Sequence, residues 1–124
     1  MLSSYGEEFG LDRELALKVA GAFGGGIARM GAQCGAVTGA LMVLGLKYGK
    51  AKAGDEGARE RTYELAREFV TRFESRHGSI VCRELLGYDL SNPEERAAAK
   101  EKGLFDTLCL QLVRDAAEMV GEML

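Results

Sequence analysis

Residues Met30–Leu46 read MGAQCGAVTGALMVLGL, and no charged residue interrupts this apolar stretch. A helix that spans a membrane needs about 20 predominantly apolar residues, and this stretch is shorter and rich in glycine. Gly31, Gly35 and Gly39 recur every four residues, a spacing that places them on one side of a helix. The stretch is therefore expected to form a long, buried, Gly/Ala-rich helix at the centre of the fold.

Alanines form a second row beside these glycines, at Ala28, Ala32, Ala36 and Ala40. Two neighbouring rows of small residues let another backbone approach closely. An interior glycine costs about 1 kcal/mol relative to alanine, so a close contact should offset that cost. The contact could be with another helix or with a ligand.

Before this stretch, Asp12 is a suitable N-cap for a helix that begins near Leu11. Leu15, Val19 and Phe23 keep one face of that helix apolar, and the glycines that follow would end it.

After the stretch, apolar residues at helical spacing predict a long amphipathic helix over 55–76, ended by His77-Gly78. Ser79 would cap a short helix that Gly87 closes, and Asn92-Pro93 begins the next one. An apolar stripe that starts at Leu108 predicts the last helix. No run alternates with a period of two residues, so no strand is expected.

A chain of 124 residues predicts a single helical domain over 1–124. The expected fold is all-α, a compact bundle of five or six helices around the long Gly/Ala-rich helix. The net charge of −3, the absence of Trp and an aromatic content of 7% give no basis for nucleic-acid binding. The polar, acidic segment Ser3–Gly10 is not a signal peptide, so a cytoplasmic location and no membrane association are expected.

Most familiar site motifs are absent. Gly24, Gly25 and Gly26 follow no strand and precede no Gly-Lys-Ser/Thr, so they are neither a dinucleotide fingerprint nor a P-loop. They either end a helix or present backbone N–H groups to a ligand. Together with Gly35 and Gly39 of the small-residue row, they are the candidate cofactor-binding residues. The single histidine, His77, is read as a helix-end cation, with a metal ligand or a proton donor as the alternative.

Three cysteines remain, Cys34, Cys82 and Cys109, and each lies on an apolar helical face. They could point into one core, either as small buried hydrophobic residues or as a working site. Neither C-x-x-C nor zinc-ligand spacing is present. Cys82 is expected in the first turn of a short helix, where the helix field favours a thiolate.

The blocks that contain these cysteines read GGGIARMGAQCGAVTGALMVLGLKYG over 24–49, HGSIVCRELLG over 77–87 and GLFDTLCLQLVRDAAE over 103–118. With FGLDRELALKVA over 9–20, they resemble the redox-active protein family named after its C…GCAxxG…C…C cysteine pattern, over nearly the whole chain. The resemblance implies a redox role in which Cys34, Cys82 and Cys109 are the catalytic residues or metal ligands. Gly39 matches the closing glycine of the family box.

Two features depart from the family pattern. Cys34 precedes Gly35, the reverse of the order in the family name, which would turn the sulfur by about 100° around a helix. The family's leading cysteine has no counterpart, since only Met1–Ser4 precede Tyr5. Lack of the helix that carries it would expose apolar surface, which favours a homodimer.

Two functions follow as hypotheses. The first is a thiol- or metal-dependent oxidoreductase in which Cys82 is the more reactive thiol and Cys34 or Cys109 is its resolving partner or a fellow ligand. Arg83 or His77 would stabilise the thiolate. A metal ion or an iron–sulfur cluster stays open as the cofactor, and the redox partner is not identified.

The second hypothesis is a non-catalytic helical binding or assembly module in which the cysteines are structural. It would use the Gly/Ala face of the central helix, beside Leu41, Met42 and Leu44.

Overall fold

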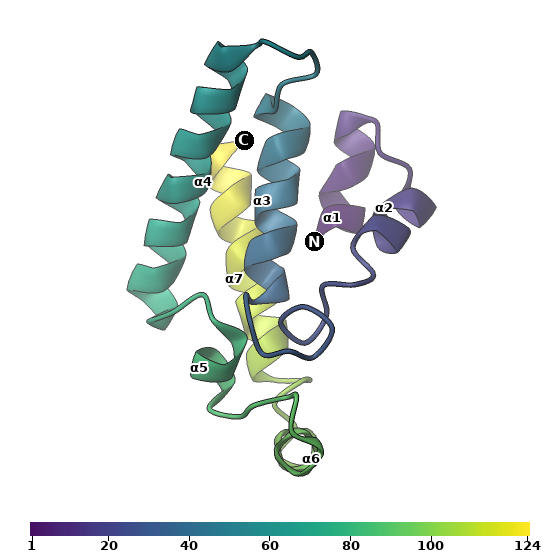
Figure 1. Ribbon diagram of the computed structural model, residues 1–124, viewed down its shortest axis with the longest axis vertical. Coiled ribbons are helices and arrows are strands. Elements are labelled where there is room, and N and C mark those ends of the chain that lie inside the picture. Colours follow the sequence, from purple (N-terminus) through teal and green to yellow (C-terminus); the bar gives the residue numbers. More distant parts are fainter.

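A computed structural model describes all residues, 1–124, and contains no β-strand (Figure 1). The elements are α1 (Leu2–Tyr5), the 3₁₀ helix η1 (Gly6–Phe9), α2 (Arg13–Val19), α3 (Gly35–Tyr48), α4 (Glu56–His77), α5 (Cys82–Leu86), α6 (Pro93–Glu101) and α7 (Leu108–Met123). The all-α prediction is confirmed. Seven α-helices form rather than five or six, and the N-terminal segment, for which no helix was predicted, contributes α1 and η1.

Helices α3, α4 and α7 pack side by side, and α1, η1 and α2 lie on the other side of α3 (Figure 1). The short helices α5 and α6 lie at one end of this bundle. The main core lies between the long helices, and its largest fully buried side chains are Val37, Val43, Leu44, Phe69, Phe73 and Val120. A second, smaller core cluster contains Cys82, Leu86, Leu90 and Ala99.

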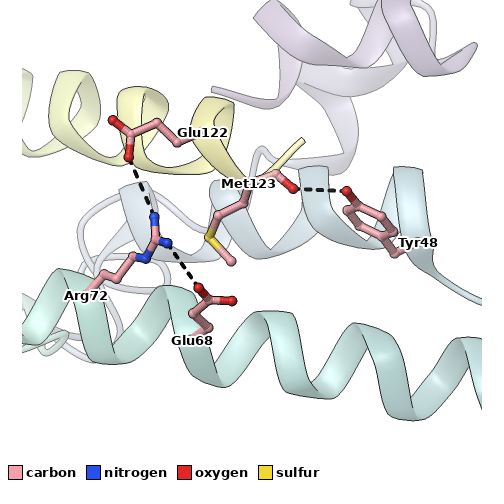
Figure 2. Close-up of polar contacts among 5 residues, drawn as sticks. All are labelled: Tyr48, Glu68, Arg72, Glu122 and Met123. Atoms are coloured by element: carbon pink, nitrogen blue, oxygen red, sulfur yellow. Dashed lines mark hydrogen bonds and ion pairs between the residues drawn. The ribbon is translucent and has the colours of Figure 1, made fainter.

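Polar contacts join the long helices to one another (Figure 2). Arg72 of α4 lies 3.0 Å from Glu68 and 3.6 Å from Glu122 of α7. The Tyr48 hydroxyl, at the end of α3, donates to the Met123 carbonyl oxygen at 2.9 Å. These contacts fix the three helices to one another. No helix is long and apolar enough to cross a membrane.

Helix α3 begins at Gly35, five residues later than the predicted start at Met30. Gly31, Ala28 and Ala32 consequently lie in the preceding loop and not on a helix face. Gly39 is buried, and a Cβ atom built there would lie 2.9 Å from Cβ of Met1. The small-residue face that remains is therefore covered by the chain's own N-terminus.

Helix α2 is capped by Asp12, whose side chain accepts a hydrogen bond from the Leu15 N–H at 3.2 Å, as predicted. The predicted apolar face does not pack inward, because Leu15 is 51% exposed and Val19 is 52% exposed. The fully buried residue of α2 is Ala16. The helix ends at Val19, so Gly24–Gly26 do not end it.

Instead, Gly24–Gly26 enter a left-handed loop. Gly25, Gly26, Ile27, Ala28 and Arg29 have φ values of 66°, 69°, 66°, 47° and 65°, so five consecutive residues are left-handed. Each non-glycine residue in this region costs about 1–2 kcal/mol. Backbone hydrogen bonds within the loop, such as the one from Ala32 N–H to Gly26 O at 2.9 Å, hold this conformation.

The other helix boundaries follow the sequence signals closely. Asp55 caps α4, and Gly78, with a φ of 89°, ends it. Asn92 caps α6 directly before Pro93. Ser79 was expected to cap α5, but the N-cap is Val81, and the Ser79 hydroxyl instead accepts from the Val81 N–H at 2.9 Å.

Candidate functional site

The starts of α3, α5 and α7 meet at one end of the bundle, beside the left-handed loop (Figure 1). A pocket of about 1100 Å³ lies there, and Cys34, Cys82 and Cys109 all line it. Residues of both core clusters form its walls, so the pocket occupies the junction between the two clusters. The expectation that the three cysteines share one region of the fold agrees with this arrangement.

Each cysteine stands at a helix start. Cys34 is the N-cap of α3, with an extended backbone (φ −56°, ψ 130°). Cys82 is the first residue of α5 and is 7% exposed, while Cys109 is the second residue of α7 and is half-buried. Because Cys34 precedes its helix, the predicted rotation of its sulfur around a helix axis does not apply. All three cysteines are free thiols.

A short backbone pairing places Cys34 and Cys82 on the same face. Gln33 and Val81 form an isolated antiparallel bridge. On either side of it, the Cys34 N–H donates to Ile80 O at 2.8 Å and the Cys82 N–H donates to Ala32 O at 2.6 Å. Successive side chains along each strand of such a pairing point to opposite faces, and residues directly opposite each other share a face. Residues 34 and 82 are both one position beyond the bridged pair, so they lie on the same face. Two cysteines 48 positions apart in sequence thus enter one pocket.

Gly26 of the left-handed loop packs directly against Cys82. A Cβ atom at Gly26 would lie 2.6 Å from Cβ of Cys82 and 2.7 Å from the Ala32 nitrogen. The positive φ and this close approach both require glycine. The loop therefore forms one wall of the pocket through its backbone.

Burial is the main influence on the Cys34 thiol, and it raises the pKa above the ordinary value. The backbone N–H groups of Ala36 and Val37, in the first turn of α3, lower this pKa in part. Neither N–H group is close enough and well enough aligned to form a capping hydrogen bond to the Cys34 sulfur. Of the three thiols, only Cys34 has backbone N–H groups that offset part of the rise in its pKa.

The expectation that Cys82 is the more reactive thiolate is wrong. Burial, and then the neighbouring Cys34 and Cys109, raise its pKa from 9.0 to about 11. The start of α5 does not lower this pKa, because the N–H groups of Cys82 and Arg83 already donate to carbonyl oxygens of the loop before α3. α5 also has only five residues, so its dipole is small.

The three thiols influence one another's ionisation. Burial raises the pKa of Cys109 first, and the charge of Cys34 raises it further. The charges of Cys34 and Cys109 both raise the pKa of Cys82 as well. Ionisation of one thiol in the pocket therefore disfavours ionisation of the next.

Four of the five glycines predicted to bind a cofactor lie together in the structure. Gly24, Gly25, Gly26 and Gly35 line the cysteine pocket. Gly39 does not, and it borders a smaller cavity of about 220 Å³ near Met1.

The two predicted charge partners of a thiolate do not line the pocket. His77, at the end of α4, has Nε2 3.0 Å from Oδ2 of Asp115 on α7, although the ring N–H is not aligned for a hydrogen bond. The Arg83 side chain points to the Gly31 carbonyl oxygen, at 3.4 Å. Both are therefore structural contacts between elements.

The predicted metal site finds no geometric support. No group of three or more His, Cys, Asp or Glu side chains is arranged to hold a metal ion. The three sulfurs share a pocket, yet they do not converge as the ligands of a zinc site or an iron–sulfur cluster do.

Comparison with known families bears on the role of these thiols. A family model described as "Putative redox-active protein (C_GCAxxG_C_C)" matches residues 1–123. The chain belongs to this family. Membership in the C_GCAxxG_C_C family supports a general redox role for the protein. No curated protein and no solved structure matches the chain.

The sequence analysis did not identify the cations that line the cysteine pocket, which are Arg29, Arg96 and Lys100. The four-residue spacing of Arg96 and Lys100 on a predicted helix was a usable signal, since it places both on one face. Nothing in the sequence signalled Arg29, because its direction depends on the left-handed loop.

Proposed function

We propose that the protein is a thiol–disulfide oxidoreductase in which Cys34 is the attacking thiol and Cys82 the resolving thiol. One observation carries this proposal: three cysteines from distant parts of the chain line one pocket and act on one another's ionisation. A buried structural cysteine needs neither a pocket nor another thiol beside it. The redox role of the family supports the same conclusion.

Cys34 is assigned as the attacking thiol because it is the one thiol of the three with backbone N–H groups that offset part of the rise in pKa caused by burial. The first-turn N–H groups of Ala36 and Val37 act on it, and α3, with 14 residues, is long enough for a helix field. Cys82 is assigned as its partner because the Gln33–Val81 bridge holds the two residues on the same side of one backbone pairing.

The reaction transfers two electrons. The Cys34 thiol loses its proton, and its thiolate attacks one sulfur of a substrate disulfide, so that a mixed disulfide forms and one substrate thiolate leaves and is protonated. The Cys82 thiol then loses its proton and attacks the Cys34 sulfur, which releases the second substrate thiol. The protein becomes oxidised by one disulfide bond and the substrate is reduced to two thiols.

The test uses the single variants Cys34→Ser, Cys82→Ser and Cys109→Ser with hydroxyethyl disulfide as the oxidant, followed by intact-mass spectrometry. Cys34→Ser should lose the reaction. Cys82→Ser should stop at a mixed disulfide on Cys34, visible as the added mass of one substrate half. Cys109→Ser is the matched control and should still form the Cys34–Cys82 disulfide.

Two results would contradict the assignment. Oxidation of Cys34→Ser at the wild-type rate would remove Cys34 from the role of attacking thiol. Complete oxidation of Cys82→Ser to an intramolecular disulfide would instead make Cys109 the resolving thiol.

One observation favours the alternative function, a helical binding or assembly module: apolar residues of α2 are exposed. Leu15, Leu17 and Val19 are 51%, 54% and 52% exposed, and Leu15 and Val19, four positions apart, lie on one face of the helix. We infer that α2, and not the Gly/Ala face of α3, would be the contact surface in a homodimer. Light scattering tests this: wild type should show the dimer mass and Leu15→Lys/Val19→Lys the monomer mass, while a monomeric wild type would refute it.

A further inference from the structure

Three cations line the cysteine pocket. Arg29 extends from the left-handed loop, while Arg96 and Lys100 lie one turn apart on α6. The pocket therefore has positive charge on two elements that are far apart in the sequence. No Asp or Glu lines it.

These cations have no anionic partner within the protein. None of them belongs to an ion pair, whereas Lys18, Arg59 and Arg72 all pair with carboxylates. Arg96 reaches only the Leu90 carbonyl oxygen, at 3.5 Å, and no side-chain hydrogen bond involves Arg29 or Lys100. In a chain with 19 acidic residues and a net charge of −3, a pocket with three unpaired cations and no carboxylate is a marked local excess.

The remaining wall is apolar. Leu85, Leu86, Phe105 and Val113 line the pocket beside the thiols. Its volume of about 1100 Å³ is slightly above the usual range for small-molecule sites, roughly 300–1,000 Å³. A small organic molecule thus fits the pocket better than a single inorganic ion does.

We propose that the pocket binds a low-molecular-weight disulfide that carries carboxylates, with its acidic groups at Arg29, Arg96 and Lys100 and its sulfur atoms at Cys34. This inference rests on the proposed function, since it names the substrate class of the same thiols. The two arginines and the lysine that line the pocket attract the anion, and the apolar wall accommodates its carbon chain. The bound disulfide accepts two electrons from Cys34 and Cys82 and leaves as two carboxylate-bearing thiols.

The rate experiment compares three small disulfides that differ in charge: dithiodipropionate, a dianion; hydroxyethyl disulfide, which is neutral; and cystamine, a dication. Each rate of protein oxidation is divided by the rate of the same disulfide with dithiothreitol, which removes differences in intrinsic reactivity. The dianion should react about tenfold faster than the neutral probe on this scale. Its advantage should shrink as salt is added, because these cations are near solvent.

The charge variants provide the matched control. Arg96→Gln/Lys100→Gln should bring the dianion close to the neutral probe. Lys50→Gln/Lys52→Gln removes the same charge from exposed residues outside the pocket and should keep the wild-type preference.

A binding experiment separates this inference from the proposed function. Thiodipropionate has two carboxylates but a thioether in place of the disulfide, so it binds without reacting. NMR titration at millimolar concentration should show binding to wild type and to Lys50→Gln/Lys52→Gln, and at least fivefold weaker binding to Arg96→Gln/Lys100→Gln.

The binding result decides the inference, and the oxidation result decides the proposed function. Binding that depends on Arg96 and Lys100 supports the carboxylate site even if no disulfide oxidises the thiols. No binding, or equal binding to both double variants, overturns it even if all three disulfides oxidise the thiols.

Discussion

At the scale of single residues, Gly26 determines whether Cys82 can occupy its place in the pocket. A Cβ atom at position 26 would lie 2.6 Å from Cβ of Cys82, at a φ of 69°. Gly26→Ala should therefore lower the free energy of unfolding by about 2–4 kcal/mol, through left-handed strain and overpacking. Urea denaturation measures this change.

Gly24→Ala is the control for Gly26→Ala, because no atom lies within 4 Å of the Cβ it would add. Its stability should stay within about 0.5 kcal/mol of wild type. Equal stability of the two variants would contradict the close approach of the loop to Cys82.

The ionisation of Cys82 gives a second prediction at this scale. Its folded-state pKa is raised, so its thiolate is scarce near neutral pH and increases only as the pH rises from 9.0 towards about 11. Since the thiolate is the nucleophile, pulsed alkylation of Cys82, read by peptide mapping, should accelerate steadily across that interval. A plateau near pH 8.5, the ordinary cysteine value, would contradict the raised pKa.

The sequence singled out the three cysteines that line the pocket, but its argument for an acidic Cys82 does not agree with the structure. Position in a first helical turn suggested an acidic Cys82, yet its burial and its two neighbouring thiols depend on packing that no local pattern encodes. The cysteines could be singled out from the sequence because thiols are a residue type suited to redox chemistry.

At the scale of the elements, the left-handed loop is the feature that most needs explanation. Ala28 has a φ of 47°. Ala28→Gly removes that strain at the cost of a more flexible unfolded chain, so a net gain of about 0.5–1 kcal/mol in unfolding free energy is expected. Ala66→Gly, inside α4, should instead lose about 1 kcal/mol. Thermal denaturation of the pair should show changes of opposite sign, and a loss in both would contradict the left-handed conformation.

The contact between α4 and α7 gives another prediction. Asp115 is 4% exposed and accepts from Gln111 at 2.8 Å, with Arg76 at 3.5 Å and His77 at 3.0 Å. Asp115→Ala leaves these partners without a carboxylate, which should cost about 2–3 kcal/mol of unfolding free energy. Asp106→Ala, an exposed carboxylate without a side-chain partner, should change little. Comparable urea midpoints for the two variants would contradict the role of Asp115.

Helical periodicity predicted the long elements well and failed where backbone contacts decide the structure. α4 has apolar residues at helical spacing with charged residues between them, a clear N-cap at Asp55 and a glycine at position 78, so its limits were readable. The segment before Gly35 has small residues compatible with a helix. It forms the loop instead, where its carbonyl groups accept hydrogen bonds from the Cys82 and Arg83 N–H groups.

At the scale of the whole molecule, the core is divided and the pocket lies at the division. The main cluster joins α3, α4 and α7, the smaller cluster lies at α5 and α6, and the pocket lined by the three thiols lies where the two meet. The all-α class was predictable from periodicity alone. The meeting of three helix starts was not, because it depends on connections between segments up to 75 positions apart, from Cys34 to Cys109.

The most direct measurement is a redox titration of the purified protein across ratios of reduced to oxidised dithiothreitol, read by intact mass and peptide mapping. We expect a single two-electron transition in which each chain loses two hydrogens, links Cys34 to Cys82 and keeps Cys109 as a thiol. Three free thiols at every ratio, or disulfides formed only between chains, would contradict the account.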